Sequence, residues 1–149
     1  MTLDLERLEQ SFEKVKGNAL EFAASFYHNL FSDYPEAQPL FAHTNMAAQQ
    51  KKLLDSLILV IENLRRPEVL THALKGLGTR HMQYGARPEH YPLVGNTLLK
   101  TFEQYLGADW TPETQQAWTN AYTAITSLML DGAEHVQDSA SPNLTVLGS

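Results

Sequence analysis

Residues 70–92 read LTHALKGLGTRHMQYGARPEHYP, and the fold prediction starts from this stretch. Spacings of four, three and four positions place four residues on one face of a predicted α-helix, namely Leu70, Leu74, Leu77 and His81. Gly85 is expected to end this helix, and Pro88 and Pro92 to delay the next one. The segment therefore predicts an inward-facing helix that carries a histidine close to its end.

His81 has two interpretations. A histidine on an apolar helix face is more often a core residue hydrogen-bonded to a carbonyl than a metal ligand. In the alternative, the neutral imidazole binds iron through Nε2 while a free carbonyl at the helix end holds its Nδ1–H. The choice depends on whether the chain supplies a second wall facing His81.

The composition excludes several classes of site. The chain has 149 residues, enough for one domain with its own core, and a net charge of -6, which argues against nucleic-acid and anionic-membrane partners. It contains no cysteine, which removes disulfides, thiolate zinc sites, a cysteine nucleophile and covalent haem attachment. Any cofactor would be held non-covalently or by His, Asp, Glu or Tyr.

The ends of the chain predict its organisation. The N-terminal sequence MTLDLERLEQ is charged and lacks the apolar run of a signal peptide, and no segment is long and apolar enough to span a membrane. We therefore expect a cytoplasmic protein. Residues 1–136 are predicted to form one domain, and residues 137–149 a disordered tail with no periodicity.

Helical periodicity recurs along the rest of the chain. It predicts helices over residues 5–15, 19–31, 49–64, 92–105 and 112–129, with a short turn of helix over 35–41 and an irregular stretch over 42–48. Thr111 followed by Pro112 is a strong helix start. Strand alternation is absent from the sequence, so we predict an all-α fold of about seven or eight unequal helices in orthogonal packing.

Two polar residues are candidates for the wall opposite His81. Tyr27 lies on or beside the apolar stripe of the second helix, and Gln49 lies one turn before the inward-facing Leu53. A buried tyrosine is often only a core aromatic whose hydroxyl finds a backbone partner, and Gln49 could equally be a solvated residue at a helix start. If both face His81, they supply two hydrogen-bond donors.

Several motifs together resemble one known family. They are the run FYHNLF at residues 26–31, the corner at 35–41, LGTRHMQYG around His81, and HYPLVGNTLLKTFEQYL from His90. In this order and at these separations they resemble the globin family, specifically the single-domain bacterial haemoglobins related to the globin module of flavohaemoglobins. The resemblance spans residues 5–129. It implies the globin fold, with helices packed three over three around a non-covalent haem b.

The resemblance also implies roles for individual residues. His81 matches the proximal iron ligand, and Tyr27 and Gln49 match the distal residues that contact bound O₂, with Gln50 as the alternative to Gln49. His28 and His43 are possible internal sixth ligands, although both are expected on the surface. Further residues match positions around the haem or suit its propionates: Phe41, Leu53, Leu77, Val94, Tyr91, Arg80, Lys51 and Lys52.

One departure from the family pattern concerns the proximal side. Flavohaemoglobins hold the proximal histidine in a network with a tyrosine and a glutamate. Tyr91 matches the tyrosine, but Ala133 stands where the glutamate is expected, with Glu134 one residue away. The resemblance therefore does not by itself imply the strong donation of electron density to the iron that this network provides.

Three functions stay open at this point. The first is reversible binding or transport of O₂, with CO and NO as further ligands. The second is NO dioxygenase activity, with Tyr27 and Gln49 at the catalytic site and a separate reductase, since the sequence carries no flavin or nicotinamide domain. The third is a haem-based sensor or interaction module. A di-iron carboxylate bundle would need two Glu-x-x-His pairs, and the sequence has none.

Overall fold

The computed structural model describes the backbone of residues 4–83 and 89–139 and the side chains of residues 4–80 and 89–132. Within these ranges the chain forms helices and no strand, as the sequence predicted. The elements are α1 (Leu5–Lys16), α2 (Ala19–Asp33), the 3₁₀ helix η1 (Pro35–Phe41), α3 (Met46–Glu62), α4 (Pro67–Gln83), α5 (His90–Leu106), the 3₁₀ helix η2 (Gly107–Asp109) and α6 (Pro112–Ser139). No helix in the described ranges combines the length and apolar character needed to cross a membrane.

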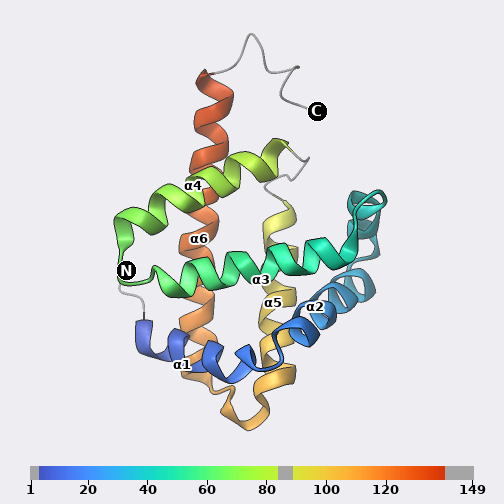
Figure 1. The fold of residues 1–149 in the computed structure, drawn as a ribbon, viewed down its shortest axis with the longest axis vertical. Coiled ribbons are helices and arrows are strands. Elements are labelled where there is room, and N and C mark those ends of the chain that lie inside the picture. The colour runs from blue at the N-terminus through green and yellow to red at the C-terminus, as the bar shows by residue number, and fades with distance from the viewer. Residues whose placement is uncertain (1–3, 84–88, 140–149) are drawn as a thin grey trace.

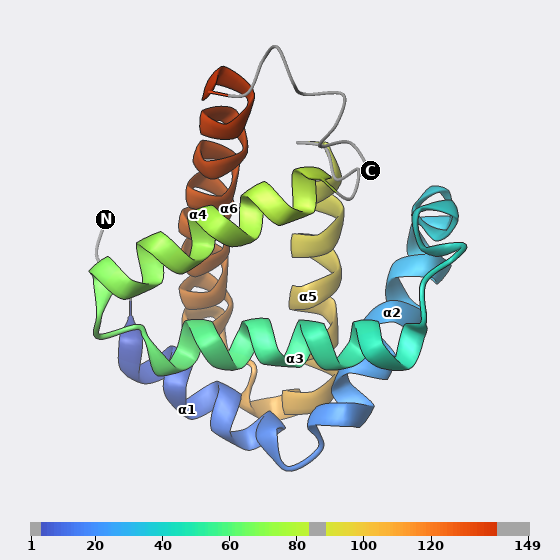
Figure 2. The ribbon, with the colours of Figure 1, turned by 45° about the horizontal axis from the view of Figure 1, so that its top comes forward.

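The helices cross in two layers. In both ribbon views α1, α3 and α4 run across the long axes of α5 and α6 (Figures 1 and 2). The helix α2 packs against both α5 and α3 and so joins the layers. The orthogonal, three-over-three packing expected from the sequence is confirmed, and it brings α2 and α3 to one region of the molecule.

An aromatic cluster fills the core beneath these crossings. The rings of Phe102 and Trp118 stack with centroids 4.2 Å apart, and Phe22 lies 4.8 Å from Phe102. The buried indole of Trp118 donates from Nε1 to Ser11 Oγ at 2.8 Å, so its polar edge is satisfied. This core holds α1, α2, α5 and α6 together. It thereby fixes α2 and α5, which carry several of the predicted site residues.

Local capping sets several helix ends. Asp4 Oδ1 accepts from the backbone N–H of Arg7 at 3.2 Å, and Thr111 Oγ1 accepts from that of Thr114 at 3.1 Å. Gly107 ends α5 with a φ of 53°, in the region that favours glycine. The predicted starts of the first and last helices are therefore confirmed.

Two predicted helix starts were wrong. The helix α3 begins at Met46, inside the stretch expected to be irregular, because Asn45 Oδ1 caps it by accepting from the N–H of Ala48 at 3.2 Å. The helix α5 begins at His90 and not at Pro92. Proline is tolerated in the first turn because an N–H there has no partner within the helix.

The predicted end of the domain lies close to the end of the described chain. The helix α6 continues to Ser139, past the expected boundary at residue 136. Gly85 and Pro88 lie in residues 84–88, outside the described ranges, as do residues 140–149. The disordered tail remains a prediction.

Candidate functional site

Tyr27 on α2 and Gln49 on α3 are hydrogen-bonded side chain to side chain. Gln49 Nε2 donates to Tyr27 Oη at 3.1 Å, and Tyr27 is 5% exposed. Because the hydroxyl accepts from Gln49, its own proton is still available for donation. Among the described residues, no protein acceptor receives that proton. The pair therefore presents a buried O–H donor held by a neighbouring amide.

Burial keeps the Tyr27 hydroxyl protonated. Desolvation raises the pKa of Tyr27, and the hydrogen bond from Gln49 opposes this shift only in part. The charged phenolate is disfavoured because it would lose hydration. Tyr27 is thus a neutral donor throughout the physiological pH range.

Aromatic rings hold Tyr27 in place. The Phe26 and Phe41 ring centroids lie 5.0 and 5.6 Å from that of Tyr27, both edge to face. Phe31 lies 5.5 Å from Phe41 and links α2 to η1. Phe41 and Leu53 are partly buried against this core, so each also offers apolar surface to a ligand.

The other predicted site residues lie on α4 and α5. Leu77 and Val94 are partly buried, Tyr91 is buried, and Arg80 is exposed. Burial also raises the pKa of Tyr91. His81 falls within α4, on the stripe of the buried Leu70 and Leu74, but its side chain lies outside the described residues.

The structure distinguishes between the alternative residues that the sequence offered for the site. Gln50 makes no hydrogen bond to Tyr27, whereas Gln49 does. His28, His43, Lys51 and Lys52 are exposed, and the side chains of Ala133 and Glu134 lie outside the described residues. Between the two glutamines, the geometry therefore favours Gln49 as the partner of Tyr27.

Tyr122 supports Tyr91, a role that the sequence reasoning missed. Tyr122 Oη donates to the Tyr91 carbonyl oxygen at 2.7 Å. Its ring lies against Gly95, where a Cβ would be only 2.5 Å from Tyr122 Cε2. Burial raises the pKa of Tyr122, so its hydroxyl stays a donor. The only sequence signal for this contact was a glycine in the interior of a helix, which indicates close packing.

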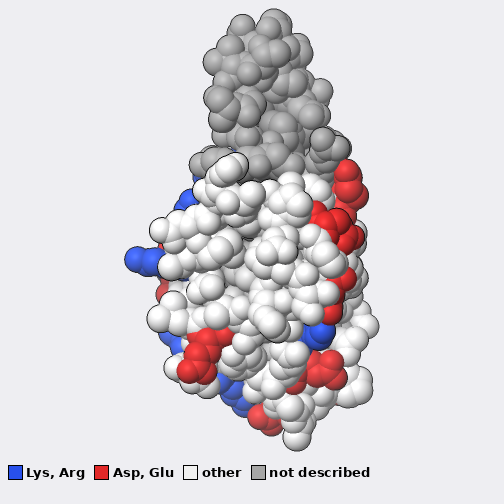
Figure 3. All heavy atoms as spheres, turned by 90° about the vertical axis from the view of Figure 1, so that its right-hand side faces the viewer, with Lys and Arg blue, Asp and Glu red and all other residues white. Residues whose placement is uncertain are grey.

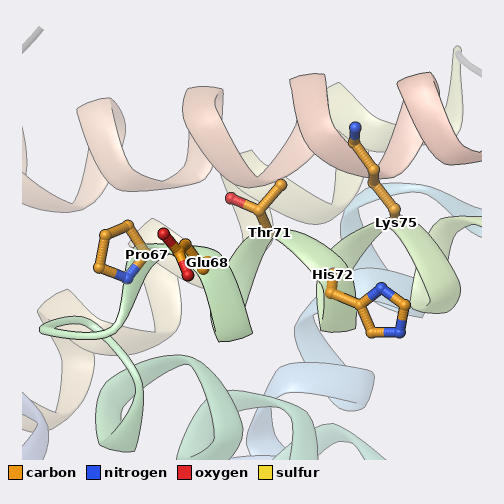
Figure 4. A pocket seen from close by; sticks show the side chains of 5 residues that line it. All are labelled: Pro67, Glu68, Thr71, His72 and Lys75. Atoms are coloured by element: carbon orange, nitrogen blue, oxygen red, sulfur yellow. The ribbon is translucent and has the colours of Figure 1, made fainter.

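Two surface hollows of the molecule lie apart from the predicted site residues. One, of about 420 Å³, is lined by Pro67, Glu68, Thr71, His72 and Lys75 of α4 (Figure 4). In this view Lys75 reaches toward α6 while His72 points away from it. The other, of about 490 Å³, is lined by residues of α1 alone. Hollows formed by one helix face do not bring functional groups together, so neither is a candidate site.

Charged and metal-binding side chains are scattered in the part of the chain that the structure describes. The face shown in Figure 3, on the side of η1 and α2, is mostly uncharged and lacks a continuous basic patch of the kind that binds phosphate backbones. Among the described residues, no three His, Cys, Asp or Glu side chains gather to hold a metal ion.

Comparison with a family model decides the family. The model described as Globin matches residues 24–129, which include most of α2 with Tyr27, and all of α3 with Gln49 and α4 with His81. The chain belongs to the globin family. The bacterial-globin resemblance inferred from the motifs is confirmed, and a haem cofactor is implied by the family.

The curated relatives of this globin include flavohemoproteins. It is 30% identical to a flavohemoprotein of Rhodopirellula baltica over 132 residues, which are 86% of this chain and 32% of that protein. It is 33% identical to one from Bacillus subtilis over 120 residues, 79% of this chain and 28% of that protein. The chain thus spans about a third or less of the length of these relatives.

Solved structures of two bacterial globins share the fold. An engineered carbene transferase, made from a proposed nitric oxide dioxygenase of Rhodothermus marinus, superposes with a TM-score of 0.82 at 26% identity, covering 94% of this chain and 99% of that one. A bacterial globin from Campylobacter jejuni gives a TM-score of 0.76 at 26% identity, covering 90% and 96%.

Proposed function

We propose that this globin binds haem b non-covalently through His81 and reversibly binds O₂, and also CO and NO, beside Tyr27 and Gln49. When bound, the haem would supply an iron that can bind diatomic gases, and His81 would hold that iron. The observation that supports this proposal most directly is the buried Tyr27 hydroxyl, which accepts from Gln49 and keeps its own proton for a ligand.

The described residues suit a flat apolar cofactor with charged edges. Phe41, Leu53, Leu77 and Val94 come from four different elements, and all are partly buried, so each has apolar surface left to contact a ring. Arg80 is exposed on α4, where its guanidinium could pair with a propionate carboxylate. The chain therefore offers both the apolar contacts and a cation that such a cofactor requires.

Tyr27 and Gln49 would determine how tightly each gas is held. Their donors stabilise a ligand in proportion to the negative charge that it gains, and each is worth about 1.5–3 kcal/mol in a buried site. CO gains less charge than O₂. The pair should therefore favour O₂ over CO relative to an apolar pocket, and Leu53 and Phe41 strengthen the effect by excluding water.

An absorption spectrum tests the cofactor directly. Protein produced with ample haem should show the spectrum of a histidine-ligated globin in its ferrous form, and distinct spectra after addition of O₂ or CO. Protein that purifies colourless and takes up no added haem would refute the proposal.

A second function, NO dioxygenase activity with a separate reductase, is favoured by the comparisons. The two curated relatives described above are flavohemoproteins, and one structural neighbour was engineered from a proposed nitric oxide dioxygenase. In this role Tyr27 and Gln49 would orient O₂ for reaction with NO. Steady NO consumption over many turnovers, with an added flavin reductase and NADH, is the expected result. NO consumption that stops after a single turnover would count against this function, because it would show reaction with the gas but no catalysis.

A further inference from the structure

The helix α4 crosses α6 with a glycine on each side of the contact. A Cβ on Gly78 would run into the backbone carbonyl group of Met129, and a Cβ on Gly132 would run into that of Lys75. The two helix backbones thus touch directly, and any side chain at either glycine would force them apart. This crossing is visible in both ribbon views (Figures 1 and 2).

Thr79 adds a hydrogen bond across the same crossing. Its Oγ1 lies 3.1 Å from the Gly132 carbonyl oxygen on α6 and 3.1 Å from the Lys75 carbonyl oxygen on its own helix. Lys75 and Asp131 also form an ion pair at 3.0 Å, but both side chains are largely exposed, so this pair adds little. The glycines therefore let the two backbones touch, and Thr79 adds a hydrogen bond between α4 and α6 at the same point.

Among the described residues, α4 is positioned mainly by its packing on α6. Among the described elements, α6 is the one against which α4 packs extensively. Gly78 and Thr79 precede His81 by less than one helical turn, and at 1.5 Å per residue the crossing lies about 3–4.5 Å from it along the axis. Because an intact helix is stiff, a displacement at the crossing will reach the backbone of His81.

We propose that Gly78, Thr79 and Gly132 are positioning residues for His81, and that they set the height and tilt of its imidazole relative to the haem. This inference rests on the proposed function, in which His81 binds the iron. The crossing limits how far α4 can move, and so would determine where His81 holds the iron.

Substitution of the glycines tests this inference. In Gly78→Ala and Gly132→Ala, α4 must separate from α6, which shifts the iron–histidine stretching band in the resonance Raman spectrum of the ferrous protein. Haem loss to an excess of a haem-scavenging protein should accelerate about 10- to 100-fold, the usual cost of removing an outer support of a metal ligand. Gly76→Ala is the matched control, since among the described atoms a Cβ there meets Arg80 Nη1 alone, at an ordinary contact distance of 3.6 Å.

Thr79 provides a second test that does not require repacking. Thr79→Val keeps the shape and removes the hydroxyl, whereas Thr79→Ser keeps the hydroxyl. We expect Thr79→Val to shift the stretching band in the same direction as Gly78→Ala, and Thr79→Ser to retain the wild-type band. This pair decides the question if the glycine variants fail to fold.

The outcomes separate this inference from the proposed function. If wild-type protein lacks an iron–histidine band, the proposed function itself fails. If the wild type and Gly76→Ala have the band, and folded Gly78→Ala and Thr79→Val show the same band and the same haem loss, the crossing does not position His81 and the inference is wrong.

Discussion

Replacement of Tyr27 by Phe is expected to raise the O₂ dissociation rate of this globin about 10- to 100-fold, since a donor at this site is worth about 1.5–3 kcal/mol. The substitution removes only the buried hydroxyl that accepts from Gln49 Nε2 at 3.1 Å, and it leaves the ring packed against Phe26 and Phe41. The CO dissociation rate should change much less. Stopped-flow displacement of O₂ by CO measures the first rate, and displacement of CO by NO the second.

Tyr34→Phe is the matched control for this prediction. The Tyr34 hydroxyl accepts from Asn96 at 3.3 Å near the surface, so its removal should leave O₂ dissociation unchanged. Equal O₂ dissociation rates in the wild type and Tyr27→Phe would contradict the donor role of Tyr27.

Gln49 should be coupled to Tyr27 in these rates. Because the two side chains are hydrogen-bonded, the effects of Gln49→Leu and Tyr27→Phe should not add in the double variant. The wild-type rate should also stay constant as the pH rises to 10, the ordinary pKa of tyrosine, because burial raises the pKa of Tyr27 above this value. An increase that begins below pH 10 would mean that the hydroxyl ionises too easily to be this buried donor.

Replacement of His81 by Ala is expected to abolish the histidine-ligated spectrum and to release the haem. Loss of an outer partner of a metal ligand costs about 10- to 100-fold in affinity, and loss of the ligand itself should cost more. The measurements are the ferrous absorption spectrum and the rate of haem transfer to a scavenging protein. Added imidazole should restore the spectrum, because it replaces the missing side chain.

His72→Ala controls for the loss of a histidine from the same helix. His72 is exposed on α4, so its variant should keep the wild-type spectrum and retain haem. An unaltered spectrum in His81→Ala, with haem still bound, would show that another residue ligates the iron, and the account of α4 as the proximal helix would be wrong.

Much of the fold could be predicted because its determinants are local. The periodicity of Leu70 and Leu74 predicted a helix face, and both residues are buried in α4. The boundary errors were also local. Asn45 was not recognised as a cap, and Pro92 was taken as a helix start although α5 begins at His90. Alternative capping residues lie only a few positions apart in the sequence. Choosing the wrong one therefore moves a predicted helix boundary by up to one turn.

The sequence by itself determined which helices form and placed Tyr27 on or beside an apolar helix stripe, because periodicity and caps depend on residues within a few turns of one another. Only the tertiary structure decided that Gln49 and not Gln50 meets Tyr27, which lies 22 positions away. It also decided that Thr79 bonds to Gly132, 53 positions away, where two glycines let the backbones of α4 and α6 touch. Such pairings arise from how helices cross, and close packing of the whole chain sets those crossings.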